Sequence, residues 1–285
     1  MNNMFNWYNG LSKRVRDSVC ISVTTVGMIS TVLSILGISI GNWIGSSFWL
    51  GIGVVFLVSL VVYLLAYFSI GRIFRKSINL TIRQTPVSIS CGDIFESSGW
   101  RIIGCDTHFD TRVDDIVISK KSLHGQLVLA HGKKGEIEAA IDIEAKRLGI
   151  QKKSDGLYDF PLGTVIRYDS SVDKQTYLML AMTELDAQYE AHTNTAVFEH
   201  MLMKMWKEIG RVYARYDVVL PVLGTGISRF DDGPKDVEAL LRCMLCTLNS
   251  SGVSLNSEVK VVIFGNIKDI PLYEYKDMFH VIPRR

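Results

Sequence analysis

Hydrophobic residues are most concentrated near the start of the chain. No Asp, Glu, Lys, Arg or His occurs from residue 18 to residue 71. A helix of about 20 apolar residues crosses a hydrocarbon core of ~30 Å, so this run is long enough for two spans. We predict transmembrane helices over 19–41 and 48–70, joined by a turn at 42–47 that contains Gly, Ser, Asn and Trp43.

Basic residues flank both predicted spans. Lys13, Arg14 and Arg16 precede the first span, and four more basic residues follow the second, at positions 72, 75, 76 and 83. Because positive residues remain on the cytoplasmic side, we predict a multi-pass protein of the cell membrane with both termini cytoplasmic, including a segment over 1–18. A cleaved signal peptide is the alternative, and the second apolar stretch directly behind the first weighs against it.

Small and hydroxyl-bearing residues recur along the first predicted span. Such residues allow helices to approach each other closely in lipid. They either pack against the second span or mediate self-association, and we expect a homo-oligomer. The residues concerned are Ser22, Thr24, Thr25, Gly27, Ser30, Thr31, Ser34 and Gly37.

The chain changes character after the second span. A basic juxtamembrane linker is predicted over 71–85, and residues 86–285 have the composition of a globular domain. Strands are predicted over 86–91, 100–105, 126–130, 163–168, 176–182, 217–222 and 259–264, and helices over 136–148, 194–214 and 234–249, the last with Pro234 in its first turn. The fold class is therefore α/β, a mixed sheet flanked by helices, preceded by an α-helical two-span transmembrane hairpin.

Composition and charge exclude several classes of function. The 285 residues include 31 basic and 29 acidic side chains, a net charge of +2, which argues against a nucleic-acid partner. Five Cys argue against a disulfide scaffold, and Cys243 and Cys246 in a predicted helix are interpreted as apolar filling. The six His show no ligand spacing, so no metal site is predicted. His108 and His124 are the histidines most expected to line a pocket, with structural hydrogen bonding as the alternative.

The loop after the 217–222 strand is the first candidate for binding chemistry. It contains Gly224 and Gly226 and leads toward the helix predicted from 234. Glycines let backbone N–H groups approach an anion, and a nearby helix start favours phosphate. The loop lacks the Walker A and Gly-x-Gly-x-x-Gly patterns, and a plain tight turn is the alternative.

A second candidate lies at the end of the first strand of the globular domain, in Gly92-Asp93-Ile94. A carboxylate at that place can accept a hydrogen bond from an exocyclic amine such as that of adenine. The alternative is that Asp93 caps a turn, which is the commoner use of such a residue.

Together these two segments resemble the macro domain, an α/β module that binds ADP-ribose. The resemblance covers roughly residues 86–285. It implies that Asp93 holds the adenine amine with Ile94 beside it, and that Phe264 and Asn266 lie near the adenine. It also implies that the diphosphate is wrapped by Gly224, Thr225, Gly226 and Ile227. We further predict that Leu223, Ser228 and Arg229 of the same loop bind the ligand.

The whole chain resembles the two-span membrane macro proteins of the Thoeris anti-phage systems. Besides the hairpin and residues 223–229, the resemblance is carried by Phe109-Asp-Thr111, Asp114-Asp-Ile-Val-Ile-Ser119 and Ser122-Leu-His-Gly-Gln126. It implies an effector without cofactor or catalytic residue. A partner enzyme with a TIR domain converts NAD into an ADP-ribose-derived signalling nucleotide, the macro domain binds this signal, and the hairpin then disrupts the lipid bilayer, which kills or arrests the infected cell.

Asp106 departs from the pattern of hydrolytic macro domains. By the resemblance it stands near the Asn that touches the distal ribose in many members, and no run of three glycines follows it. A carboxylate accepts hydroxyl hydrogens and suits a cationic group, so we expect a modified ADP-ribose as ligand. A membrane-tethered ADP-ribose hydrolase, with Asp106 or His108 as base, and a passive scaffold remain the alternatives. Asp110 and Thr111 either contribute to the site or cap a turn.

Overall fold

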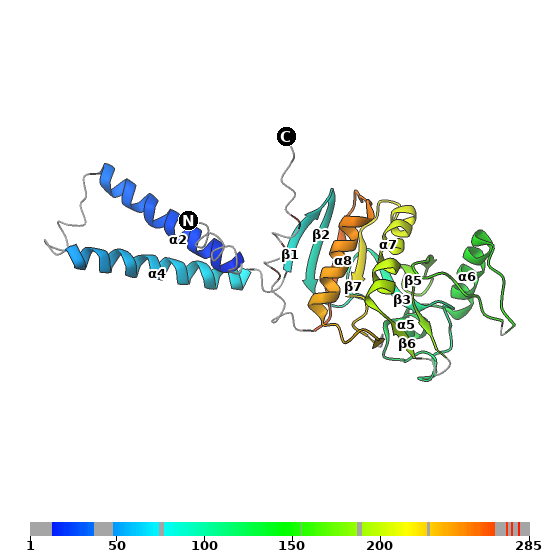
Figure 1. The fold of residues 1–285 in the computed structure, drawn as a ribbon. Coiled ribbons are helices and arrows are strands. Elements are labelled where there is room, and N and C mark those ends of the chain that lie inside the picture. The colour runs from blue at the N-terminus through cyan, green and yellow to red at the C-terminus, as the bar shows by residue number, and fades with distance from the viewer. Residues whose placement is uncertain are drawn as a thin grey trace. The chain divides into compact units, whose positions relative to one another are not determined.

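The computed structural model describes residues 13–36, 48–73, 77–154, 156–186, 190–226 and 229–265, and the single residues 272, 275 and 279. The chain divides into two compact units (Figure 1). One consists of residues 1–78 and 271–284, and the other of residues 79–270 and 285. The first contains two long apolar helices, and the second contains most of an α/β domain.

The two long helices are α2 (Lys13–Ile35) and α4 (Phe48–Ile73). Their apolar parts are Arg14–Ile35 and Trp49–Arg72, with mean hydropathies of 1.8 and 2.5, and only 11% and 0% of an 18-residue stretch within each is buried. A core helix of a soluble protein would be mostly buried, so length, composition and exposure together agree with membrane-crossing helices. Helix α2 starts before the predicted span at 19, and the predicted turn at 42–47 lies outside the described residues.

Two side chains of α2 show that it runs antiparallel to α4. The guanidinium of Arg14 donates to the Tyr67 carbonyl at 2.9 and 2.6 Å, and the Ser22 hydroxyl donates to the Ser59 carbonyl at 2.7 Å. Ser22 is thus a residue that packs against the second span, as in the first of the two interpretations above. Gly27, Ser30, Thr31 and Ser34 are exposed in the single chain. Their role in self-association stays a prediction.

Nine strands of the described chain form one mixed sheet in the order β1-β2-β9-β7-β3-β5-β6-β8, with β4 paired to β5. Strands β2, β9, β7, β3 and β5 are mutually parallel, so their carboxyl ends lie along one edge of the sheet. Strands β4 and β6 run antiparallel to β5. The strand bounds are β1 Ser77–Ile82, β2 Thr85–Cys91, β3 Trp100–Asp106, β4 Val165–Asp169, β5 Thr176–Leu185, β6 Ala191–Thr193, β7 Val218–Pro221, β8 Arg229–Phe230 and β9 Val259–Ile263.

Helices flank this sheet, which confirms the predicted fold class (Figure 1). Ile137, Ile141 and Ala145 of α6 (Lys134–Leu148) join a buried cluster with Ile103 of β3. Helices α7 (Thr195–Val212) and α8 (Val237–Ser251) are joined by the indole of Trp206, which donates to the Thr247 hydroxyl at 3.2 Å. Met201 and Met205 are fully buried beside Trp206, so the apolar residues of α7 are core residues.

Three predicted elements differ in the structure. The strand at 126–130 is wrong, because this short apolar run continues α5 (Leu123–Gln126) as the π-helix η1 (Leu127–His131). Residues 77–85 are not simply a linker, since β1 buries Ile78, Leu80 and Ile82 in alternation. Helix α8 begins at Val237, capped by Asp236, whose carboxylate accepts from the Ala239 amide at 2.7 Å. Pro234 therefore precedes the helix rather than opening its first turn.

Candidate functional site

A cavity of about 660 Å³ lies at the carboxyl ends of the five parallel strands. Gly92 and Asp93 enter it after β2, Phe264 after β9, Val222 to Gly226 after β7, and Asp106 at the end of β3. This is the place where α/β sheets bind ligands, because the loops that leave the strands meet there. The structure thus brings together the two candidate segments that are about 130 residues apart in the sequence.

The two glycines of the loop after β7 have different roles. Gly224 has a φ of +85°, and a Cβ there would lie 3.3 Å from Leu240 and 3.4 Å from Phe198. It is therefore needed for the turn itself. A Cβ on Gly226 would meet nothing within 4 Å. Gly226 keeps the cavity open and leaves room for a ligand against the backbone.

Two hydrogen bonds hold the rest of this loop in place, one to helix α8 and one within the loop. The Leu223 amide donates to the Met244 sulfur of α8 at 3.3 Å, and the Thr225 hydroxyl donates to the Val222 carbonyl at 2.9 Å. Val222 and Leu223 are buried, whereas Thr225 and Gly226 are exposed. The loop is thus a tight turn whose exposed tip lines a cavity, so the two interpretations of its sequence are compatible.

Asp93 also combines its two expected uses. One carboxylate oxygen, Oδ1, accepts from the Phe95 amide at 2.8 Å and caps the turn after β2. The other makes no hydrogen bond within the described part of the chain, and Asp93 lines the cavity. Ile94 lines it as well and is 4% exposed. The capping role is confirmed, and the free oxygen remains able to accept from a ligand.

Asp106 is the most unusual polar group of the cavity. Its Oδ1 accepts from the amides of His108 at 2.7 Å and Asp110 at 3.4 Å, so the side chain is held in place by backbone. Its Oδ2 is buried and has no hydrogen-bond partner among the described residues. Leaving a buried carboxylate oxygen unpaired costs free energy, which a ligand donor would recover. The burial of Cys105 and the adjacent Asp106 charge raise the pKa of the Cys105 thiol well above its usual value.

His124 faces Asp106 across a gap. Its Nδ1 lies 3.8 Å from Asp106 Oδ2, and both side chains are less than a tenth exposed. Burial lowers the pKa of His124, and the carboxylates of Asp106 and Asp110 oppose this shift only in part. The imidazole is therefore neutral near pH 7 and lines the cavity, as expected of one of the two histidines singled out from the sequence.

Comparison with known proteins identifies the family. The family model of the macro domain of Thoeris protein ThsA matches residues 87–264. The Thoeris protein ThsA of Bacillus amyloliquefaciens (strain Y2) is 30% identical over 230 residues, which are 77% of this chain and 75% of that protein. The chain belongs to the Thoeris ThsA family.

Two solved structures of the Oceanobacillus iheyensis macrodomain are also similar to this chain. One was solved with ADP and the other with MES bound, and their sequence identities are 15% and 16%. Both have a TM-score of 0.46, and they cover 70% and 72% of this chain and 93% and 97% of their own.

The segment 114–126, which carried the resemblance to Thoeris proteins, forms one wall of the cavity of this ThsA macro domain. Asp114 accepts from the amides of Ile116 and Val117, and Asp115 accepts from the Lys120 amide. Gly125 is buried under this turn, where an added Cβ would lie 2.2 Å from the Ser119 carbonyl oxygen. The motif is thus a self-capped loop that closes on a glycine.

Several predicted residues lie away from the cavity. Arg229 begins β8, where its 61% exposed side chain forms an ion pair with Glu190, so its contact with a ligand stays a prediction. His108 is not among the lining residues, and its ring contacts the Thr107 hydroxyl. Asp110 caps a turn by accepting from the Arg112 amide at 2.9 Å. Ile227, Ser228 and Asn266 lie outside the described residues.

Lys121, Met182 and Thr183 line the cavity without having been expected from the sequence. Lys121 stands directly before the Ser122-Leu-His motif, which could have indicated it. Met182 and Thr183 line the cavity because β5 pairs in parallel with β3, so the carboxyl ends of both strands lie at the same edge of the sheet. Only the strand order supplies that information.

Proposed function

We propose that this ThsA-family chain is a membrane-anchored effector of Thoeris anti-phage defence whose macro domain binds an ADP-ribose-derived signal. The supporting observation is the cavity at the five strand ends, with Gly226 open on one side and the unpaired Asp106 Oδ2 on another. The exposed backbone of Thr225 and Gly226 suits a diphosphate, and the free oxygen of Asp93 suits the adenine amine. Asp106 suits a hydroxyl or cationic group on the distal ribose.

The signal is proposed to be made from NAD by a TIR-domain partner, as the family resemblance implies. Binding is proposed to change the packing of membrane hairpins within a homo-oligomer, so that the bilayer is disrupted and the infected cell dies or stops growing. A ligand drives such a change only through its different affinities for the resting and active assemblies. Neither a cofactor nor a catalytic group is required for this chemistry.

Two measurements on the full chain test the proposal. Isothermal titration of the detergent-solubilised protein with ADP-ribose and NAD should show saturable binding that Gly226→Val abolishes. Cells that contain the chain and its signal-producing partner should lose membrane potential on infection, and cells with the Gly226→Val chain should not. Depolarisation that persists in the variant would contradict the link between ligand and membrane.

A membrane-tethered ADP-ribose hydrolase is the second candidate function. The observation in its favour is the buried Asp106–His124 pair, because a carboxylate and a neutral imidazole are the groups that general acid–base catalysis uses. Of the two bases expected from the sequence, Asp106 lines the cavity and His108 does not. Incubation with ADP-ribosylated protein distinguishes the two functions, since turnover that is lost in Asp106→Asn would favour the hydrolase.

A further inference from the structure

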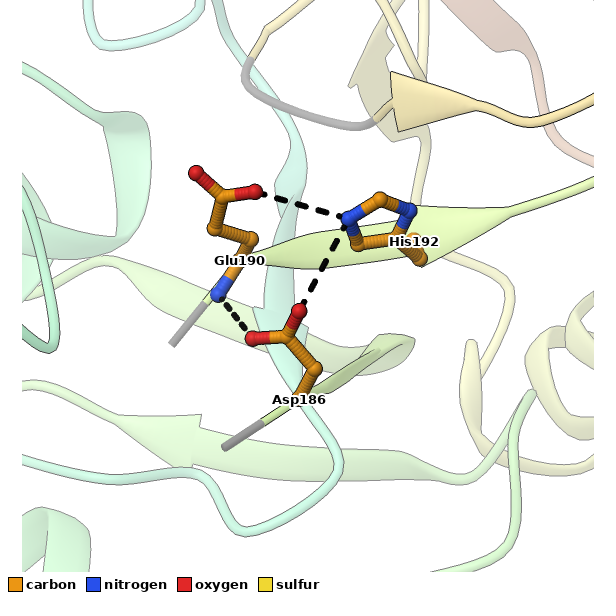
Figure 2. A group of neighbouring side chains, drawn as sticks. All are labelled: Asp186, Glu190 and His192. Carbon is orange, nitrogen blue, oxygen red and sulfur yellow. Dashed lines mark hydrogen bonds and ion pairs between the residues drawn. The ribbon is translucent and has the colours of Figure 1, made fainter. Parts of the chain in front are cut away.

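Three side chains that could coordinate a metal ion meet on the hairpin between β5 and β6. Asp186, Glu190 and His192 each offer one donor atom, and these atoms all lie within 4.8 Å of one another. Figure 2 shows the two carboxylates directed at the Nε2 atom of His192, with which Glu190 and Asp186 form ion pairs of 3.5 and 3.7 Å. The Glu190 amide also donates to Asp186 Oδ1 at 2.8 Å, so the backbone of Glu190 orients the Asp186 carboxylate.

The contact between His192 Nδ1 and Asp231 shows which nitrogen of the imidazole carries a hydrogen. His192 Nδ1 lies 2.8 Å from Asp231 Oδ1, and a carboxylate can only accept, so Nδ1 carries a hydrogen. In the neutral ring, Nε2 then presents a lone pair to two carboxylate oxygens. Electron-pair donors gathered in this way attract a cation, and the Arg229 guanidinium already pairs with the Glu190 oxygen. A metal ion would contact all three donors. A carboxylate on the outer nitrogen of a histidine ligand is also the usual support of a metal-binding imidazole.

We propose that Asp186, Glu190 and His192 bind a divalent transition-metal ion, with Asp231 orienting the imidazole. Donor atoms around a tetrahedral ion with bonds of ~2.1 Å lie about 3.4 Å apart. The two distances to His192 Nε2 are 3.5 and 3.7 Å, and the two carboxylate oxygens lie within 4.8 Å of each other. One imidazole and two carboxylates leave a coordination position for water. The sequence did not indicate this site, because it contains one histidine and because Asp231 joins it from beyond β8.

Arg229 contacts one of these three donors. The guanidinium pairs with the same Glu190 oxygen that faces His192, and strands β6 and β8 hold His192 and Arg229 in register. A metal ion must displace Arg229 from that oxygen. Arg229 is three residues beyond Gly226 in the sequence, so metal binding would free a cationic side chain that is close in sequence to the glycine loop. The site itself does not depend on the proposed nucleotide function.

Zn²⁺ titration of the chelator-treated, detergent-solubilised full chain tests the proposal. We expect one saturable site with a raised thermal unfolding midpoint, lost in His192→Ala and in Asp186→Asn. Asp231→Asn should weaken binding about 10–100-fold, as removal of such outer partners does. Arg229→Met should strengthen it, because a competing cation is gone. His200→Ala, an exposed histidine of α7, is the matched control and should bind as the natural chain does.

Equal binding in His192→Ala and the natural chain, or loss of binding only in His200→Ala, would overturn the proposal.

Discussion

His124 Nδ1 and Asp106 Oδ2 lie 3.8 Å apart inside the cavity, too far for a hydrogen bond. Both side chains are buried, and Asp106 Oδ2 has no other hydrogen-bond partner among the described residues. Native proteins pair nearly all such atoms, so an unpaired one at a cavity wall indicates a missing donor. This unpaired oxygen is the basis of the proposed ligand contact of Asp106.

The contribution of His124 to the stability of the protein should be lost as the pH drops below about 6.5. Burial lowers the pKa of His124, so the unfolded chain binds a proton there at a pH where the folded chain does not. By linkage, this contribution to folding is present above the unfolded pKa and is lost as the pH falls toward the lower folded value. Thermal unfolding midpoints of the solubilised chain across this range check it. His124→Gln should flatten the profile, and identical profiles would contradict this role of His124.

Asp106→Asn should change ligand preference rather than folding. The remaining side-chain oxygen can still accept from the His108 and Asp110 amides, while the negative charge in the cavity disappears. Relative to ADP-ribose, the affinity for NAD, which carries a cationic ring on the distal ribose, should fall about tenfold. Titration of both ligands measures this ratio. Asp169→Asn, an exposed site on β4, is the control, and an unchanged ratio in Asp106→Asn would contradict the prediction.

Valine at the two loop glycines should separate binding from stability. Gly226→Val adds atoms where nothing lies within 4 Å, so the unfolding midpoint should stay unchanged while ADP-ribose binding is lost. Gly224→Val must adopt a φ near +85° and press on Leu240, so it should destabilise the domain by about 2 kcal/mol. Calorimetry and thermal unfolding of both variants check this. Equal stability loss in both would show that Gly226 also serves the turn.

Hydrophobic pattern was sufficient to predict the two long helices and, separately, the strands whose ends form this site. The alternation or length of apolar runs located α2, α4 and the five parallel strands, since each buries or exposes a continuous face. It failed at 126–130, where a short apolar run between Ser122 and Gly132 is compatible with strand and helix alike. The structure decides for a helix, which Ser122 starts by accepting from the Gly125 amide at 3.0 Å.

The site residues could be predicted from the sequence where they lie in a single loop. They could not be predicted where residues of several elements must come together. Gly224 and Gly226 are indicated by their own sequence. The unpaired state of Asp106 Oδ2 depends on how closely His124 approaches from another element, and Lys121 reaches the cavity only because the 114–122 turn folds back on Gly125. Such distances between distant residues are not encoded in any local pattern.

Gly125→Ala should open the cavity wall. The added Cβ would lie 2.2 Å from the Ser119 carbonyl oxygen, and backbone cannot move aside as a flexible side chain can. We expect destabilisation of about 1–3 kcal/mol together with weaker ADP-ribose binding. Gly135→Ala is the matched control, because Gly135 lies in α6 with nothing within 4 Å and alanine favours a helix. Thermal unfolding that is unchanged in Gly125→Ala would contradict the close packing of this wall.

Two adjacent lysines test the charge of the cavity. Lys121 lines it, and within the described chain its ammonium forms no ion pair, whereas Lys120 lies outside the cavity and pairs with Asp115 at 3.0 Å. A diphosphate in the cavity is attracted by the Lys121 charge, so Lys121→Met should weaken ADP-ribose binding about tenfold and reduce its dependence on salt. Lys120→Met should do neither, because that charge is already paired. Titrations at low and high ionic strength measure both effects, and equal losses in the two variants would mean that only the general positive field of this loop matters.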